Sequence, residues 1–293
     1  MNGILLVNKE KNMTSHDVVN QIRKIFNTKK VGHVGTLDPI STGVLVILLG
    51  NTTKLAPFLE NDSKEYIACL RFGMATDSYD ITGNIIEKCD DFSLDIDQLD
   101  SFLKSLIGIQ EQKPPIYSAV KVAGKKLYEY ARNNKEVEIP TREIEIYKAE
   151  RLSELKVNDY TNCDVLFSVS KGTYIRSIID ELGKKINIPC CMEGLKRIRS
   201  GKFLIQNSHT LDEIKVGNFQ LINPLEILEM PIIETDNKSE LFRKSIHGMK
   251  VSPNIFENKP FRFVVSCDNK LIAIYELCSN EIPHYKSIRV WND

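Results

Sequence analysis

Strand-like and helix-like segments follow one another irregularly along this chain of 293 residues, and that irregular order limits the folds open to it. Short runs that alternate or are rich in β-branched residues predict strands, whereas longer stretches with apolar residues every three or four positions predict helices. The segments do not keep the strict strand–helix–strand order of a doubly wound parallel sheet. We therefore expect an α+β fold with a mixed, largely antiparallel central sheet, flanking helices and a small β-rich C-terminal domain.

The segments fall into two groups, because the composition changes after about residue 231. In the first group, strands are expected at residues 3–7, 65–72, 143–152 and 162–170, and helices at residues 18–26, 94–106, 127–133 and 173–185. In the second group, short strands expected at residues 248–251, 262–265, 271–277 and 286–290 predict a compact all-β unit. We therefore expect two domains, residues 1–232 and residues 239–293.

Several function classes lack the motifs that they require. The sequence contains neither G-x-G-x-x-G after its first strand nor a nucleotide-binding P-loop. Its seven cysteines form no C-x-x-C, and its five histidines are far apart, so we expect no metal site and no cofactor. No apolar run reaches the roughly 18 residues of a membrane helix, and the first residues do not resemble a signal peptide. We expect a cytoplasmic protein that does not associate with membranes.

Charge is distributed unevenly, although the formal net charge is zero. Residues 111–135 contain six Lys or Arg and two acidic residues, and residues 171–202 contain eight and three. Residues 62–104 contain four Lys or Arg and ten acidic residues. This asymmetry is compatible with one basic face for an anionic partner and one acidic face, but solvated charge on ordinary helices would give the same pattern.

The glycine-rich loop expected at residues 32–43 is the most informative stretch. Gly32 and Gly35 allow the backbone to turn sharply and to approach a ligand closely. Pro39 restricts the preceding Asp38 to extended conformations, so a carboxylate is held on a rigid loop. A capping or turn aspartate would satisfy the same pattern, and composition alone does not separate the two interpretations.

The loop resembles the signature loop of the pseudouridine synthase B (TruB) family. Further stretches resemble the same family in the same order: residues 64–66 (KEY), 76–80 (TDSYD) with Gly83, 114–121 (PPIYSAVK), 171–177 (KGTYIRS) and 195–198 (LKRI). Together these matches span about residues 3–230. The C-terminal β segment resembles the small RNA-binding PUA domain.

The resemblance implies an enzyme that isomerises a uridine to pseudouridine at position 55, in the T-loop of tRNA, without a cofactor. It implies that Asp38 is the nucleophile, that Arg176 pairs with it, and that Tyr66 stacks on the flipped base and assists proton transfer. Such a reaction breaks and remakes a glycosidic bond, which a carboxylate is suited to do. The expected partner is the tRNA T-stem-loop, bound by a monomer that needs no other protein.

The remaining site residues implied by the family bind the RNA. His33 is expected to fill the space left by flipped nucleotides, and Tyr174 and Leu195 are expected to line the base pocket. Basic side chains are expected to contact phosphates, and those selected are Lys121, Lys125, Lys126, Arg132 and Arg197, the last in a patch with Arg199 and Lys202. Core packing and ordinary solvated charge are the alternative explanations for these residues.

Two other functions remain open at this point. One is a non-catalytic protein that binds or folds RNA, which would not need Asp38, Tyr66 and Arg176 together. The other is a carboxylate-based hydrolase of small glycosides or nucleosides, which would need a second acid near Asp38, either Asp77 or Asp80.

Overall fold

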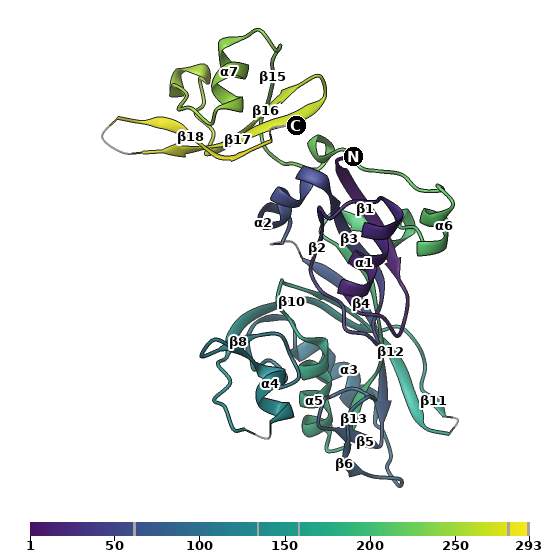
Figure 1. Ribbon diagram of the computed structural model, residues 1–293. Coiled ribbons are helices and arrows are strands. Elements are labelled where there is room, and N and C mark those ends of the chain that lie inside the picture. The colour runs from purple at the N-terminus through teal and green to yellow at the C-terminus, as the bar shows by residue number, and fades with distance from the viewer. Residues whose placement is uncertain (61–62, 134, 158, 280–281, 292–293) are drawn as a thin grey trace.

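The computed structural model describes residues 1–60, 63–133, 135–157, 159–279 and 282–291, and most of them surround one large mixed sheet (Figure 1). Its main strands run in the order β1-β3-β13-β4-β12-β10-β7. They are β1 (Gly3–Lys9), β3 (Thr42–Leu49), β13 (Cys190–Ser200), β4 (Lys64–Phe72), β12 (Thr161–Val169), β10 (Arg142–Arg151) and β7 (Gly108–Gln112). Among the described residues β13 pairs with β3 in parallel and the other pairings of this sheet are antiparallel, so the expected mixed, largely antiparallel sheet is confirmed.

Short strands extend this sheet or form separate hairpins. The extensions are β2 (Val31–Val34) on β3, β11 (Lys156–Val157) on β12 and β14 (Phe203–Leu204) on β13. The hairpins pair β5 (Met74–Thr76) with β6 (Ile85–Lys88), and β8 (Lys121–Val122) with β9 (Lys125–Lys126). The loop expected at residues 32–43 therefore begins with a strand, because its first residues pair with the apolar β3.

Three longer helices cover the sheet, namely α1 (Ser15–Ile25), α3 (Ile96–Ser105) and α5 (Ile175–Ile186). Helix α1 begins with a capping box, in which Thr14 and Asp17 exchange side-chain and backbone hydrogen bonds. The shorter helices are α2 (Ala56–Leu59), α4 (Leu127–Arg132), α6 (Leu211–Lys215), α7 (Glu240–Ile246) and the 3-10 turns η1 (Gly50–Leu55), η2 (Ile205–Asn207), η3 (Pro224–Glu226) and η4 (Pro253–Ile255). None of the helices in the described ranges is long and apolar enough to cross a membrane.

Strand β3 shows why the core forms where it does. Its apolar run is buried on both faces, which is typical of a strand covered on both sides. Alternate residues join different clusters: Val44, Val46 and Leu48 pack in one, and Leu45, Ile47 and Leu49 pack in another beneath α1. A third cluster lies between α3, α5 and the strands β4, β12 and β10.

A second sheet with the order β15-β16-β17-β18 forms the C-terminal unit (Figure 1). Its strands are β15 (Ile232–Glu234), β16 (Arg262–Cys267), β17 (Lys270–Cys278) and β18 (His284–Val290). The expectation of an all-β unit is wrong in two respects. Ser239 caps helix α7 within the unit. Residues 248–251 do not form the expected strand, and Val251 alone among them makes an isolated bridge, to Tyr285.

The second sheet packs against the first domain through a shared apolar cluster. Val264, Ile274 and Trp291 belong to the same buried cluster as Ile4 and Leu6 of β1. The indole Nε1 of Trp291 also donates a hydrogen bond to the Asn51 carbonyl oxygen in η1, at 2.8 Å. The two sheets are thus joined by apolar packing and not by a linker alone.

Candidate active site

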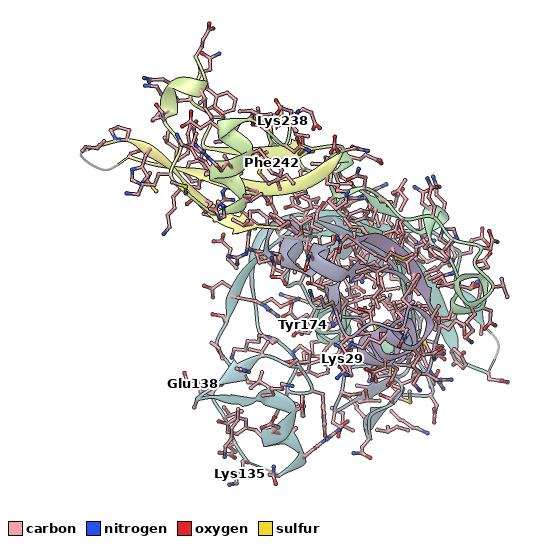
Figure 2. The ribbon with its side chains drawn as sticks, turned by 45° about the horizontal axis from the view of Figure 1, so that its top comes forward. Lys29, Lys135, Glu138, Tyr174, Lys238 and Phe242 are labelled. Carbon is pink, nitrogen blue, oxygen red and sulfur yellow. The ribbon has the colours of Figure 1, made fainter. Side chains whose placement is uncertain are left out.

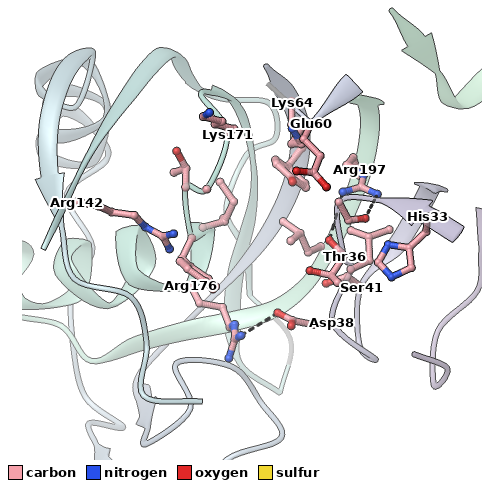
Figure 3. Close-up of a pocket in the computed structure, with 18 of the residues that line it drawn as sticks. His33, Thr36, Asp38, Ser41, Glu60, Lys64, Arg142, Lys171, Arg176 and Arg197 are labelled. Atoms are coloured by element: carbon pink, nitrogen blue, oxygen red, sulfur yellow. Dashed lines mark hydrogen bonds and ion pairs between the residues drawn. The ribbon is translucent and has the colours of Figure 1, made fainter. Parts of the chain in front are cut away.

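Seven of the residues selected from the sequence line one pocket of about 650 Å³ (Figure 3). The β2–β3 loop, β4, β13 and the segment before α5 meet there, although they lie far apart in the sequence. The seven residues are His33, Asp38, Tyr66, Tyr174, Arg176, Leu195 and Arg197.

The loop that carries Asp38 is clamped by a buried arginine. The Arg197 guanidinium donates to the carbonyl oxygens of Val44, Thr36 and Gly35 at 2.8, 3.3 and 3.2 Å. Ser15 adds a second clamp, because its hydroxyl accepts the N–H of Leu37 at 2.8 Å. These bonds fix the backbone on both sides of the loop.

The prediction that Arg197 contacts RNA phosphates from a surface patch is wrong. Its side chain is fully buried, and its three nitrogens donate to backbone oxygens, two in the Asp38 loop and one in β3. Gly43 explains how the arginine strand comes so close: its φ is +104°, and a Cβ there would lie 2.2 Å from the Arg197 carbonyl oxygen. Arg197 holds the shape of the pocket from within.

Lys9 also supports this loop, and the sequence analysis missed it. The Lys9 ammonium is buried and donates to the carbonyl oxygens of Met13 at 2.7 Å and Pro39 at 3.4 Å. Burial lowers the pKa of Lys9 to about 8, against the opposing effect of the Asp38 carboxylate. A signal was present, because Lys9 continues the alternation of Leu5 and Val7, which face the core.

Arg176 bridges two carboxylates at the floor of the pocket. Its Nη2 lies 2.9 Å from the Oδ2 atom of Asp38, and its Nη1 lies 3.4 Å from the Oδ2 atom of Asp80 (Figure 3). The guanidinium also donates to the carbonyl oxygens of Ser78 at 3.1 Å and Tyr117 at 3.2 Å. Five donors in a rigid fork suit an arginine to such a junction.

The two carboxylates bound by Arg176 differ in access to the pocket. The Asp38 side chain is 41% exposed, whereas that of Asp80 is 5% exposed and does not line the pocket. Asp80 accepts hydrogen bonds from the Ser78 hydroxyl and the Thr82 N–H at 2.9 Å each. Asp38 is therefore available to a ligand, and Asp80 orients the arginine.

The alternative function as a hydrolase required Asp77 or Asp80 as a second acid facing the ligand. That placement is wrong, because neither residue lines the pocket.

The pocket walls are aromatic and apolar. Tyr66 on β4 is buried, and Leu195 on β13 packs against the cluster that contains it. Tyr174 precedes α5, and its backbone is held by the buried side chain of Gln112. The Gln112 amide accepts the Tyr174 N–H at 2.8 Å and donates to the Tyr174 carbonyl oxygen at 3.0 Å. Gln112 thus fixes the position of Tyr174 in the pocket wall. It also fixes the start of α5, the helix that carries Arg176.

The Gln112 clamp predicts a loss of stability in Gln112→Glu. The new carboxylate has no donor for the Tyr174 carbonyl oxygen and places a charge in a buried site, so the free energy of unfolding should fall by about 2–3 kcal/mol. Urea denaturation measures the change. The matched control is Gln98→Glu on the exposed face of α3, which should change the free energy by less than about 0.5 kcal/mol. Equal values for the two variants would contradict the clamp.

The other predicted basic residues lie outside the pocket. Lys121 pairs with Lys126 in the β8–β9 hairpin, Lys125 begins β9, and Arg132 ends α4, which follows the hairpin. Lys126 and Arg132 each lie 5.3 Å from the ring centre of Tyr128. These four residues form one basic hairpin–helix unit. In the described part of the chain no three His, Cys, Asp or Glu side chains are grouped so that they could hold a metal ion.

Comparisons with known proteins agree on one family. Residues 23–175 match the model of the TruB family pseudouridylate synthase N-terminal domain. The chain is 41% identical over 305 aligned residues to tRNA pseudouridine synthase B of Staphylococcus aureus strain MSSA476, with 99% of each chain covered. The protein of the same name from strain JH9 is 40% identical over the same length and coverage.

Two solved structures share the fold. A chain of a Cbf5-Nop10-Gar1 complex matches with a TM-score of 0.69 and 22% identity, covering 99% of this chain and 84% of that one. A chain of an H/ACA RNP bound to a substrate RNA containing 2'-deoxyuridine matches with a TM-score of 0.68 and 21% identity, covering 99% and 85%. At sequence identities this low, the two matches show a shared fold and nothing about function.

Proposed function

This chain belongs to the TruB family of pseudouridylate synthases, and on that premise we propose that it isomerises the uridine at position 55, in the T-loop of tRNA, with Asp38 as nucleophile. The observation that carries the proposal is the ion pair of 2.9 Å between Arg176 and a partly exposed Asp38 at the floor of the pocket. An ionised carboxylate held by an arginine suits an attack on an electrophilic carbon.

The reaction proceeds by breaking and remaking bonds to one sugar carbon. The Asp38 carboxylate attacks the uridine, the bond between C1′ and N1 breaks, and the base leaves with the electron pair. The base then rotates, C5 bonds to C1′, and Asp38 is released unchanged. C5 loses its proton and N1 gains one, so nothing enters or leaves. We assign the proton transfer from C5 to the Tyr66 hydroxyl, which lines the same pocket.

Arg176 and Asp80 prepare Asp38 for this step. The guanidinium fixes the direction of the Asp38 carboxylate through an ion pair of 2.9 Å. Asp80, on the buried side, fixes the guanidinium in turn. Arg176 thus orients the Asp38 carboxylate without covering it, since 41% of the Asp38 side chain remains exposed.

The base must leave its stack to reach this pocket. Flipping costs a few kcal/mol, and stacking on Tyr66 with contacts to Leu195 and Tyr174 recovers part of it. His33 lines the pocket. Burial, and to a smaller extent the charge of Arg197, holds the pKa of its imidazole below the usual value. We propose that this neutral ring fills the gap that the flipped nucleotides leave in the loop.

RNA binding is proposed to involve two further surfaces. In the view of Figure 2, Tyr174 lies between the C-terminal unit, labelled at Lys238 and Phe242, and the segment near Lys135 that follows the basic hairpin–helix unit. We propose two domains, a catalytic domain and a PUA-like RNA-binding domain. The predicted bounds of 1–232 and 239–293 change at one point, because β15 pairs with β16 and the second domain therefore begins at Ile232. Asp38, Tyr66 and Arg176 come from one chain, so a monomer suffices.

The direct test is incubation of unmodified tRNA transcripts with the purified protein, followed by mapping of pseudouridine. Pseudouridine at position 55 supports the proposal. Free uracil with an abasic sugar would instead indicate a hydrolase, and tight binding without a product would indicate an RNA-folding protein.

A second prediction concerns how much of the tRNA is read. An isolated T-stem-loop hairpin should be converted, because the pocket needs one flipped uridine and loops flip most readily. Affinity should fall with salt, each phosphate contact adding a log–log slope of roughly −0.7 to −0.9. The measurement is pseudouridine yield in the hairpin and in full tRNA at two salt concentrations. Conversion of full tRNA alone would show that distant parts of the tRNA are required.

A further inference from the structure

Arg142, at the start of β10, is a pocket cation that the proposed reaction does not use. Among the described residues, its guanidinium makes no hydrogen bond or ion pair, and the Nε and Nη2 atoms are buried without an acceptor. The other two arginines of the pocket differ from it. Arg176 is paired with carboxylates, and Arg197 is bonded to carbonyl oxygens.

The guanidinium of Arg142 is nevertheless held in place. Its Cζ lies 4.5 Å from the ring centre of Tyr174, which is the distance of a cation–π contact. The backbone of Gly172, at a φ of +80°, covers another side, and a Cβ there would lie 3.2 Å from Nη1. In Figure 3 the group points toward the interior of the pocket, on the side opposite His33.

A positioned arginine without a protein acceptor is a site for an anion. A buried N–H group without a partner carries a desolvation cost that an anionic ligand removes. The RNA substrate carries one anion per nucleotide, and an arginine fork fits the two free oxygens of a phosphodiester. Tyr174 also lies against the proposed base pocket, so a phosphate here belongs to a nucleotide next to the target.

We propose that Arg142 binds a phosphodiester of the RNA strand immediately beside the flipped uridine, with the ring of Tyr174 holding the guanidinium in position. The contact rests on the proposed function, because it places the flipped nucleotide in this pocket. In this arrangement Tyr174 contacts the flipped base on one side and, on the other, positions the arginine that binds the neighbouring phosphate.

The test combines salt dependence with kinetics. Arg142→Gln should raise the Kd for a T-stem-loop hairpin about tenfold at 0.1 M salt and reduce the log–log salt slope by roughly 0.7–0.9, the value for one phosphate contact. Arg142→Lys should keep the slope, because a point charge still displaces one counterion, but bind more weakly than wild type. Filter binding gives Kd, and circular dichroism checks the fold.

Arg151→Gln is the matched control, since Arg151 lies at the other end of β10 and is paired with Asp100 at 2.8 Å. It should leave the salt slope unchanged. An unchanged slope in Arg142→Gln as well would overturn the proposal. So would a reduced single-turnover rate at unchanged Kd, because it would show that Arg142 only supports Tyr174.

A chemical substitution identifies the phosphate. Hairpins with one uncharged methylphosphonate, either 5′ or 3′ of the target uridine, should bind wild type about tenfold more weakly at one linkage. The same linkage should cost Arg142→Gln nothing further. Equal losses of affinity in wild type and in Arg142→Gln at each linkage would contradict the proposed contact. Wild type that binds without forming pseudouridine would instead overturn the proposed function, since Kd and its salt slope are measured independently of turnover.

Discussion

Asp38→Asn is expected to abolish pseudouridine formation, lowering the single-turnover rate constant by about 10⁴-fold or more, while the Kd for tRNA stays within about threefold of wild type. An amide has the shape of the carboxylate but neither its charge nor its nucleophilicity. Affinity depends mainly on phosphate contacts, which this change leaves intact. The variant should fold, because Arg176 keeps Asp80 and two carbonyl oxygens as partners.

Asp77→Asn is the matched control for this experiment. Asp77 lies near the same arginine junction, but it binds Asn84 and the Tyr117 hydroxyl and does not line the pocket. It should retain a rate within about fivefold of wild type. Turnover above trace in Asp38→Asn would refute the nucleophile assignment.

Arg176→Lys is expected to lower the single-turnover rate constant by roughly 10²–10³-fold, although it conserves charge. A lysine ammonium is a point donor, and it cannot reach both carboxylates and the carbonyl oxygens of Ser78 and Tyr117 together. The buried Asp80 then loses its guanidinium partner, so the free energy of unfolding should also fall by about 2 kcal/mol. Single-turnover kinetics and urea denaturation measure the two effects separately.

The comparison variant is Arg71→Lys, at an arginine whose side chain is 28% exposed and lies 3.4 Å from Glu193. It should change neither quantity by much, because lysine keeps the charge and partly exposed ion pairs contribute little. If Arg176→Lys kept near-normal turnover, the orientation of Asp38 would not depend on the guanidinium fork.

Local patterns predicted much of this fold, but not its long-range pairings. The capping box before α1 and the alternation of β4 and β12 are properties of neighbouring residues, and both were predictable. The place of β13 between β3 and β4 depends on segments about 150 residues apart. Strand β7 escaped prediction because its sequence is polar, as an edge strand allows.

The site shows the same limit. Asp38 and Arg176 were selected through family motifs, and no local signal paired them. The role of Asp80 depends on the turn after β5, which brings it under Arg176. Arg197 was misassigned because its sequence neighbours are basic, and sequence does not reveal that its fork is bonded to carbonyl oxygens. Lys9 was the one residue that periodicity alone could have identified.

The apolar cluster shared by the two sheets also constrains how such a chain can evolve. Ile4 and Leu6 of the first strand belong to the same buried cluster as Val264, Ile274 and Trp291 of the last unit. Loss of that unit, or its exchange for another module, would leave apolar side chains of this cluster facing water. The C-terminal unit is therefore not an independent module. A lineage that loses it would also need polar substitutions on the surface around β1.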